Sequence, residues 1–330
     1  MMKIKTLKFA MPLVQLVQSV TLAKPAALAA LVAMVPLLSA CETSTLKTVP
    51  SKLGQASSMQ QLRASLAAPG TVVFTKHLSA NWQINLSGLL NLEHPKAIEA
   101  GLEERAEPIE IYLYSLQHPT KGTYFVDSGV SEKMLPNSDT SDLSYGVKMA
   151  MDTDALKVRK TTKSIASTFP DGINGVFLTH IHIDHILGVS DLPKGVAVYL
   201  GPGDVQLSNF ANAAVQGTTD RLLANAKVLR QWGFEGSTKP QVIDIFGDGS
   251  VWAIHSPGHS PGTTAYVVNS TTGPHLLTGD ASHTAWGWKH QVEPGTFSAN
   301  IPQSVTSLNV LAELVKEFPQ IHVHLGHQSL

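Results

Sequence analysis

The sequence predicts an α/β fold in which sheets and helices pack as a sandwich, and three observations support this prediction. Short apolar runs typical of strands alternate with segments of helical periodicity. Hydrophobic residues make up 43% of the 330 residues and charged residues 15%, which excludes a disordered chain. Several predicted strands end in histidine or aspartate. The single cysteine excludes a disulfide framework, and the formal net charge of −1 argues against a nucleic-acid-binding protein.

The first forty residues have the features of an export signal. They contain four lysines, no acidic residue and the apolar run AALAALVAMVPLLSA at 26–40. This run is shorter than the roughly 20 residues that cross a bilayer but suits the core of a signal peptide. It leads into Leu38-Ser39-Ala40-Cys41, which resembles the lipobox of bacterial lipoproteins. The resemblance implies cleavage before Cys41 and a lipid on its thiol.

These features predict three segments: a signal peptide at residues 1–40, a lipidated cysteine with a polar tether and then a short helix at 41–69, and a folded domain at 70–330. The alternative is a buried Cys41 at the end of an uncleaved anchor helix. Glu42 is not the aspartate associated with retention in the inner membrane. We therefore expect an exported protein, anchored by its lipid at the periplasmic face of the outer membrane. Loss of residues 1–40 changes the formal net charge from −1 to −5.

The predicted elements of the domain follow in chain order. A polar segment with mixed helical periodicity at 132–168 predicts a helix or lid-like insertion. Strands are predicted at 71–78, 82–86, 109–116, 122–126, 176–178, 195–200, 251–255, 263–268, 275–277 and 321–325. Helices are predicted at 204–214, 221–232 and 305–317.

Histidine and aspartate residues gather after the apolar strand at 176–178. The motif runs His180-Ile181-His182-Ile183-Asp184-His185. His180 and His182 alternate on a strand end and so share one side, and Asp184 and His185 can reach a neighbouring position as the chain turns into a helix. Compact nitrogen and oxygen ligands at two adjacent positions favour a dinuclear metal site. Four such groups on six residues cannot enclose two cations, so distant ligands are required.

Three later segments offer such ligands in similar contexts. His259 lies in a Pro-Gly-His loop, Asp280 in a Gly-Asp pair after a strand, and His327 in a terminal Gly-His pair. His322 and His324 form a competing H-x-H pattern near the last of these. The small neighbouring residues allow the backbone to turn sharply near a crowded centre.

Taken together, the H-x-H-x-D-H core, the Pro-Gly-His loop, the Gly-Asp pair and the terminal Gly-His pair resemble the metallo-β-lactamase superfamily. This resemblance implies a four-layer αβ/βα sandwich with two metal ions at one edge of its sheets. It implies that Asp127 holds neighbouring groups beneath the site, although a turn-forming role is the alternative. One metal would be bound by His180, His182 and His259, the other by Asp184, His185 and His327, with Asp280 bridging both.

The ligand set predicts the cofactor and the chemistry. Five imidazoles and two carboxylates without a thiolate favour Zn²⁺, with Mn²⁺, Fe²⁺ and Co²⁺ as alternatives. Two such ions about 3.5–4 Å apart can hold a bridging hydroxide that attacks a carbonyl or phosphoryl centre. We therefore expect a hydrolase, and the family resemblance implies that it cleaves a small ester or lactone, with a thioester or phosphodiester as the alternative.

A bridging Asp280 resembles the lactonase, thioesterase and phosphodiesterase branches. The segment Asp280-Ala281-Ser282-His283 is similar to the Ala-Ser-Tyr sequence that follows the bridging aspartate of acyl-homoserine-lactone lactonases. His283 takes the place of that tyrosine and is expected to donate a proton to the leaving group, with a surface histidine as the alternative. Asp184, Asp280 and His283 are thus the predicted catalytic residues. Trp286 and Trp288 are candidates for the substrate cleft or for packing.

Two rival functions are compatible with parts of the sequence. Residues 258–262 match G-x-S-x-G, and Ser260, Asp280 and His327 follow the order of a serine esterase triad. That motif requires a turn from a strand into a helix, whereas a strand is predicted after Ser260. The second rival is a metal-binding lipoprotein without catalytic activity.

Overall fold

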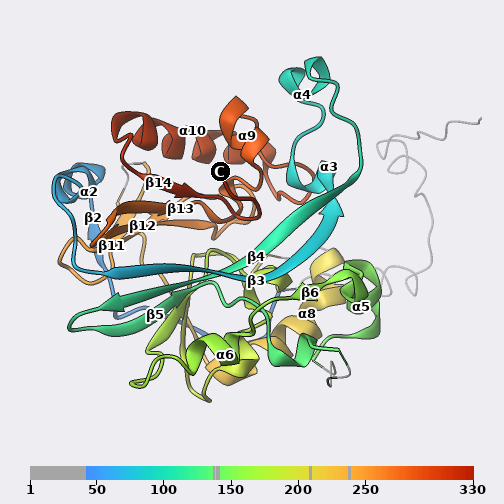
Figure 1. The fold of residues 1–330 in the computed structure, drawn as a ribbon, viewed down its shortest axis with the longest axis horizontal. Coiled ribbons are helices and arrows are strands. Elements are labelled where there is room, and N and C mark those ends of the chain that lie inside the picture. The colour runs from blue at the N-terminus through green and yellow to red at the C-terminus, as the bar shows by residue number, and fades with distance from the viewer. Residues whose placement is uncertain (1–41, 137, 139–141, 208–209, 237–238) are drawn as a thin grey trace, which may run out of the picture. The chain divides into compact units, whose positions relative to one another are not determined.

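The computed structural model describes residues 42–330 except 137, 139–141, 208–209 and 237–238 (Figure 1). The predicted signal peptide and Cys41 lie outside the described residues. None of the described helices is long and apolar enough to cross a membrane.

Two sheets form the centre of the described chain. The larger sheet has the strand order β1-β9-β8-β7-β5-β4-β3-β6; its β1, β9, β8, β7 and β5 run parallel, whereas β3, β4, β5 and β6 pair antiparallel. Its strands are β1 (Thr48–Pro50), β3 (Val73–Asn85), β4 (Ala106–His118), β5 (Gly122–Val126), β6 (Lys157–Val158), β7 (Gly175–Phe177), β8 (Ala197–Leu200) and β9 (Leu229–Gln231).

The smaller sheet has the order β14-β13-β12-β11-β10-β2, in which β13 and β14 pair in parallel and the other neighbours antiparallel. Its strands are β2 (Gln55–Ser57), β10 (Val242–Asp244), β11 (Val251–His255), β12 (Thr264–Ser270), β13 (Gly273–Leu277) and β14 (His322–His324). The α-helices are α2 (Met59–Ser65), α3 (Leu86–Leu89), α4 (Pro95–Glu99), α5 (Tyr145–Met151), α6 (Thr162–Ala166), α7 (Ile183–Ile186), α8 (Phe210–Leu222), α9 (Ala285–His290) and α10 (Ile301–Glu317).

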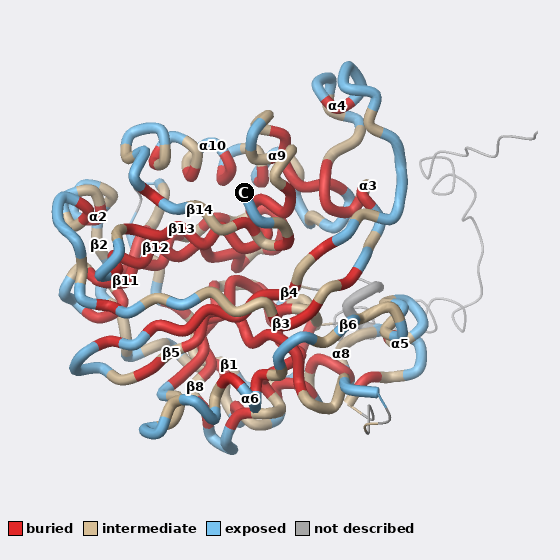
Figure 2. The backbone as a smooth tube through the Cα atoms, viewed as in Figure 1, coloured by how far each residue is buried: buried red, intermediate tan, exposed pale blue. Residues whose placement is uncertain are grey.

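Side chains of β4 alternate between two apolar layers. Ile111 and Leu113 belong to the cluster beneath the helices, whereas Tyr112, Tyr114 and Leu116 belong to the cluster between the two sheets. Neighbouring side chains of a strand point to opposite faces, so a strand in the middle of a sandwich is apolar on both. Figure 2 shows the resulting band of buried backbone through β4 and the strands of the smaller sheet.

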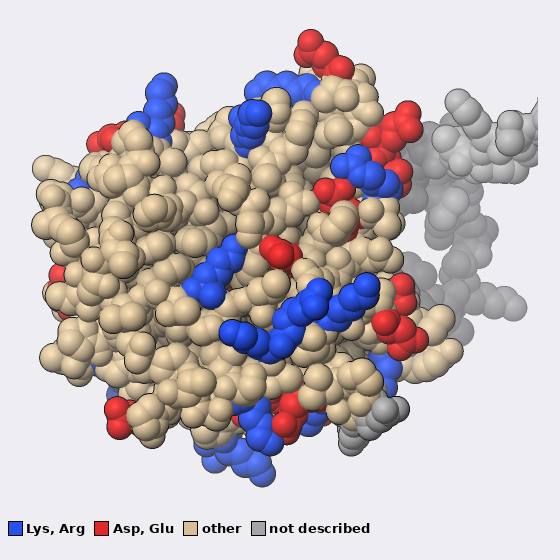
Figure 3. Space-filling model, in the orientation of Figure 1, with Lys and Arg blue, Asp and Glu red and all other residues tan. Residues whose placement is uncertain are grey.

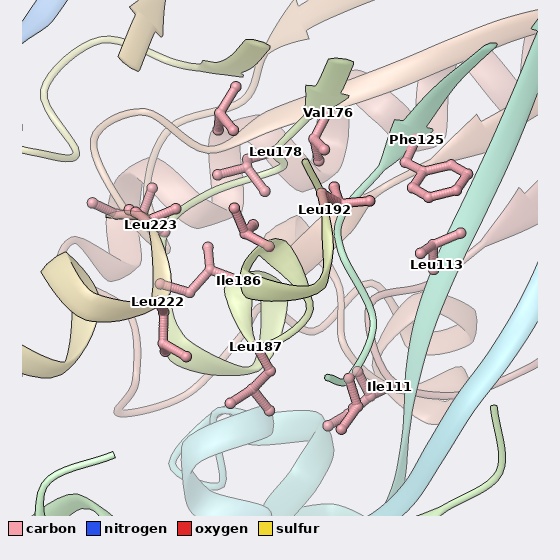
Figure 4. Packing of buried hydrophobic residues seen from close by; sticks show 14 of the residues in the cluster. Ile111, Leu113, Phe125, Val176, Leu178, Ile186, Leu187, Leu192, Leu222 and Leu223 are labelled. Carbon is pink, nitrogen blue, oxygen red and sulfur yellow. The ribbon is translucent and has the colours of Figure 1, made fainter. Parts of the chain in front are cut away.

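Helices cover the outer face of each sheet. On the larger sheet, Ile186 of α7 and Leu222 of α8 pack near Val176 and Leu178 (Figure 4). On the smaller sheet, Leu62 of α2 and Leu311 of α10 belong to one buried cluster with Ile254 and Val267. The order of layers is therefore helix, sheet, sheet, helix, which confirms the predicted four-layer αβ/βα sandwich.

Within residues 41–69, the expected tether is wrong for its described part, whereas the short helix expected after it is present as α2. Thr48–Pro50 extends the larger sheet by pairing with β9, and Gln55–Ser57 extends the smaller one by pairing with β10. Leu62 of the following helix is completely buried, and residues 42–330 form one compact unit. Backbone pairing at two open sheet edges explains why a polar segment is ordered here.

The predicted helix at 221–232 is also wrong in its second half. α8 runs to Leu222, and Leu229–Gln231 forms strand β9 between β8 and β1. Leu222, Leu229 and Trp232 are buried at spacings that also suit a helix, but pairing with two neighbouring strands decides the conformation.

On the outside, acidic and basic side chains are interspersed on a mostly neutral face (Figure 3).

Candidate metal centre

The motif at 180–185 lies where the larger sheet ends and a short helix begins. β7 ends at Phe177, and α7 begins at Ile183. The centre of the His180 ring lies 4.5 Å from the centre of the His182 ring and 4.1 Å from that of His185. The turn therefore brings three imidazoles together within six residues of the chain.

Segments from the smaller sheet bring the distant side chains to this motif. His259 Nε2 lies 2.8 Å from His182 Nδ1 and 3.4 Å from Asp280 Oδ2. His327 Nε2 lies 3.2 Å from Asp184 Oδ2 and 3.3 Å from Asp280 Oδ2. β11 ends shortly before His259, β13 before Asp280 and β14 before His327. The strand ends therefore position these three side chains, as the sequence predicted.

Asp280 connects two groups of ligand atoms. Within each group, one nitrogen or oxygen atom per residue lies within 4.8 Å of the others. The two groups are His180, His182, His259 and Asp280, and Asp184, His185 and His327. His185 Nε2 lies 3.4 Å from Asp280 Oδ1, and His327 Nε2 lies 3.3 Å from Asp280 Oδ2, so the carboxylate, a member of the first group, also contacts the second.

The donor atoms fit divalent cations. His180 Nε2, His185 Nε2 and Asp280 Oδ1 are buried and have no hydrogen-bond partner among the described residues. Burying polar atoms without partners costs free energy, and a cation at each group would supply the missing interaction. The imidazole and carboxylate donors suit Zn²⁺ and related divalent ions.

Two glycines allow the backbone to approach its neighbours closely in the segments that carry His259 and His327. A Cβ atom at Gly326 would lie 2.3 Å from Asp280 Oδ1, so a larger residue beside His327 would displace the shared carboxylate. Gly258 has φ +141°, and a Cβ atom there would lie 2.3 Å from the backbone nitrogen of Ser304. The glycines of both the Pro-Gly-His loop and the terminal Gly-His pair are therefore required by space.

Asp127 lies beneath the site and orients His185. Its carboxylate accepts hydrogen bonds from the Thr179 amide at 2.8 Å and from His185 Nδ1 at 2.9 Å. Because Nδ1 carries the proton, Nε2 of His185 presents its lone pair to the site. Asp127 has φ 52°, a left-handed conformation that aspartate tolerates better than most residues. Its supporting position agrees with the prediction from the family resemblance.

Burial and charge act in opposite directions on the pKa values of the site. Burial lowers the pKa of His180 and His259 well below the usual histidine value. Burial alone would lower the pKa of His327 too, but Asp280 and Asp184 raise it to about 10. Burial alone would raise the pKa of Asp280, but the imidazoles around it, His327 first, lower it well below its usual range. The ionised carboxylates attract protons when no metal is bound, and cations would replace those protons.

His283 is buried within the site and is not a surface residue. Its side chain is about 1% exposed, and its Nε2 lies 3.0 Å from Asp280 Oδ2. Its Nδ1 lies 2.8 Å from the backbone oxygen of Leu89. The structure thus brings all the predicted site residues together, and it leaves His322 and His324 outside the groups that share ligand atoms.

An apolar pocket of about 410 Å³ adjoins the two groups. His182, Asp184 and His259 contribute to its wall. The remaining lining residues are Thr43, Trp82, Ile84, Met151, Ile181, Ile183, Leu207, Val215, Thr219, Thr296, Phe297, Ser298 and Ala299. This volume lies within the range of small-molecule sites.

Of the two alternatives for Trp286 and Trp288, the structure shows packing, and other aromatic residues line the pocket. Trp286 stacks on His290, and Trp288 packs against the core beneath α10, whereas Trp82 and Phe297 line the pocket. Trp82 lies in the long strand β3, whose alternating pattern gave no sign of a site.

A second missed residue is Asp204, which supports the loop that carries His259. Its carboxylate is buried and accepts a hydrogen bond from the Gly262 amide at 2.6 Å. Burial raises the pKa of Asp204 to about 7. No motif in the sequence marks this aspartate, because its partner is a backbone amide of a distant loop.

The geometry disfavours the serine esterase alternative. Ser260 Oγ lies 2.9 Å from Thr263 Oγ1, and no histidine among the described residues is hydrogen-bonded to Ser260. The chain after Ser260 continues into strand β12, not into a helix. The required strand-to-helix turn is therefore missing at Ser260.

The model of the Metallo-beta-lactamase superfamily matches residues 151–319, slightly more than half of the chain. The chain belongs to this superfamily. Among curated relatives, N-acyl homoserine lactonase AttM of Azorhizobium caulinodans is 29% identical over 154 residues, which cover 44% of this chain and 55% of the relative. AttM of Agrobacterium fabrum is 27% identical over 154 residues, with the same coverage. The chain spans about half the length of these relatives.

Several solved structures share the fold at low sequence identity. A quorum-quenching N-acyl homoserine lactone lactonase has a TM-score of 0.56 at 18% identity, over 79% of this chain and 94% of the other. An N-acyl homoserine lactone hydrolase with N-hexanoyl-L-homoserine at its catalytic metal centre has a TM-score of 0.54 at 18% identity, with the same coverage. The dizinc quorum-quenching lactonase AidC has a TM-score of 0.50 at 12% identity, over 84% and 92%.

Proposed function

We propose that this protein is a metal-dependent hydrolase that opens the ring of an N-acyl homoserine lactone or cleaves a similar small ester. One observation carries the proposal: Asp280 belongs to one group of metal-binding side chains and lies within 3.4 Å of His185 and His327 of the second, beside an apolar pocket of about 410 Å³. Superfamily membership and the relatives named as lactonases support the same reaction class.

The metal centre would be dinuclear. His180, His182 and His259 would hold one ion, Asp184, His185 and His327 the other, and Asp280 would contact both. When bound, two divalent cations lower the pKa of a shared water and stabilise negative charge on the substrate oxygen. Zn²⁺ is favoured by the histidine-rich donor set and by the dizinc lactonase with the same fold.

The protein's own residues orient these groups and bind the substrate. Asp127 fixes the tautomer of His185, and Gly326 allows the backbone to approach Asp280. The acyl chain would lie against Trp82 and Phe297, with the scissile carbonyl toward the histidines and aspartate of the pocket wall. The apolar lining excludes water from the chain and leaves the polar end of the pocket for the ester group.

The test combines metal analysis with a substrate panel on the purified full-length protein. The panel contains N-acyl homoserine lactones with short and long chains, an aryl ester, a thioester, a phosphodiester and a β-lactam. We expect about two divalent ions per chain and the fastest turnover with lactones, detected by mass spectrometry as the addition of one water. Faster turnover of a thioester or phosphodiester would replace the lactone assignment. Bound metal without turnover of any member would favour a non-catalytic metal-binding protein.

We also propose that a lipid on Cys41 anchors the protein at the periplasmic face of the outer membrane. The lipobox-like residues Leu38-Ser39-Ala40-Cys41 support this proposal. The chain after Cys41 is held on the domain: the Glu42 oxygen accepts from Gln216 Nε2 at 2.7 Å, and the Thr43 amide donates to the Val205 oxygen at 2.9 Å. Such an anchor would hold the domain close to the bilayer.

Membrane fractionation tests the anchor. The wild-type protein should incorporate radioactive palmitate and sediment with outer membranes, and Cys41→Ser should lose both properties. Equal palmitate incorporation by Cys41→Ser would refute the anchor without affecting the proposed reaction.

A further inference from the structure

His283 has the surroundings of a metal ligand, although it lies outside the seven residues assigned to the centre. We infer that His283 is an eighth protein ligand, which binds a cation through Nε2 together with Asp280 and His327. This inference rests on the proposed metal centre. It replaces the role of proton donor that the sequence predicted, because a nitrogen that binds a cation carries no proton to donate.

The first argument is the tautomer of the His283 ring. Its Nδ1 lies 2.8 Å from the backbone oxygen of Leu89, and a carbonyl oxygen only accepts hydrogen bonds, so Nδ1 carries the proton. In the neutral ring, Nε2 then presents a lone pair to the site. His327 is held in the same way, with Nδ1 3.1 Å from the backbone oxygen of Glu110. A carbonyl partner on the remote ring nitrogen is one of the usual supports of a metal-binding histidine.

The second argument is the distance from Nε2 to the shared carboxylate. His283 Nε2 lies 3.0 Å from Asp280 Oδ2, and the corresponding distances are 3.3 Å for His327 and 3.4 Å for His259. No aligned hydrogen bond joins His283 Nε2 to Asp280 among the described contacts. A neutral nitrogen lone pair next to a carboxylate oxygen is repelled unless a positive charge lies near both. A cation bound by both atoms removes that repulsion.

The third argument is the arrangement of the rings. The His283 and His327 rings are nearly parallel, with centres 5.6 Å apart and planes inclined by 10°. Asp280, His283 and His327 each offer an atom within 4.8 Å of the others, and all three are buried. They form a third overlapping group that shares two members with the assigned ligands. The lactonase-like pattern has tyrosine at the position of His283, so this ligand would be a specific feature of this chain.

The experiment compares His283→Phe with His275→Phe as a matched control, in the full-length protein. Both variants replace a largely buried histidine by an apolar ring, but His275 lies outside the metal groups. The first measurement is the affinity for Zn²⁺, by competition with a chromogenic chelator. The second is the proton NMR spectrum of Co²⁺-loaded protein, in which the N–H protons of cobalt-bound histidines are strongly shifted and exchange with solvent.

We expect His283→Phe to bind one of its cations at least about tenfold more weakly, because even outer-shell partners of a ligand change affinity by 10- to 100-fold. It should also lose one shifted N–H signal, while His275→Phe keeps the wild-type affinity and spectrum. His283→Gln should reproduce the lost signal if the phenylalanine variant folds poorly.

Wild-type affinity and an unchanged set of signals in both His283 variants would overturn the inference, and lower turnover in them would then assign His283 as a proton donor. Absence of bound metal in the wild-type protein would refute the proposed function as well, so the two failures are distinguishable.

Discussion

Two histidine clusters lie along the same pair of strands and differ in their neighbours. Within β13 and β14, His275 lies opposite His322 and stacks on Phe74 at a ring distance of 4.0 Å, with His324 beside it. Just beyond the ends of the same strands, Asp280 and His327 join the metal centre. We call His275, His322 and His324 the stacked cluster. Among the described residues, no ion pair links this cluster to a carboxylate.

The difference shows that carboxylates determine what a group of histidines can do. In the stacked cluster, burial lowers the pKa of His275 to about 4 and that of His324 to about 3, so both rings are neutral and pack as aromatic groups. In the metal centre, Asp280 and Asp184 add negative charge that attracts protons or cations. A histidine within these strands therefore packs against aromatic rings, whereas one just beyond their ends lies beside carboxylates.

The largest contrast between the clusters should follow substitution of the shared carboxylate. Asp280→Asn should lower kcat/KM by about 1,000-fold or more, since a lost metal contact removes several kcal/mol of transition-state stabilisation. His275→Gln should leave turnover unchanged. Steady-state kinetics with metal analysis tests this, and circular dichroism checks that both variants are folded. Near-normal turnover by Asp280→Asn would contradict the bridging role.

Removal of the support beneath the site should have a smaller effect. Asp127→Asn keeps the size of the side chain but no longer offers a charged acceptor to His185 Nδ1. We expect metal affinity to fall by about 10- to 100-fold. Metal titration in the presence of a competing chelator measures the change. An affinity equal to wild type would show that Asp127 serves the local turn alone.

The pocket should distinguish substrates by chain length. Phe297 lines the pocket and is 42% exposed, so Phe297→Ser should raise KM for a long-chain lactone by about three- to tenfold through lost apolar contact. A short-chain lactone that does not reach Phe297 is the internal control. Equal changes for the two lactones would indicate that the acyl chain lies elsewhere.

The smallest effect should come from the stacked cluster and concerns stability. The folded-state pKa values of His275 and His324 lie below the unfolded value of about 6.5, so the unfolded chain binds more protons between these limits. The pair therefore contributes its full stability above about pH 6.5 and loses it as the pH falls toward 4. Urea denaturation at pH 7.5 and 5 should show a smaller pH effect for a His275→Phe, His324→Phe variant than for wild type. Equal pH effects in the two proteins would contradict this assignment.

The sequence predicted much of the fold because its main signals are local. Strand periodicity gave β4, β5 and β11 within a few residues, and turn residues marked the ends of β7 and β13. The same reasoning failed for the tether within 41–69 and for β9, where short segments become strands by pairing with sheet edges far away in the chain. Pairing of this kind leaves almost no periodic signal in three residues.

The amino-acid order was enough to identify the side chains at the strand ends, because metal binding requires particular residue types and these lie in recognisable motifs at His180, His259, Asp280 and His327. Tertiary structure alone decided which histidines meet carboxylates and which stack with aromatic rings. It also decided that His283 is buried beside Asp280 and that Trp82 and Phe297 line the pocket. These properties depend on distances between segments far apart in the chain, and only packing of the two sheets fixes those distances.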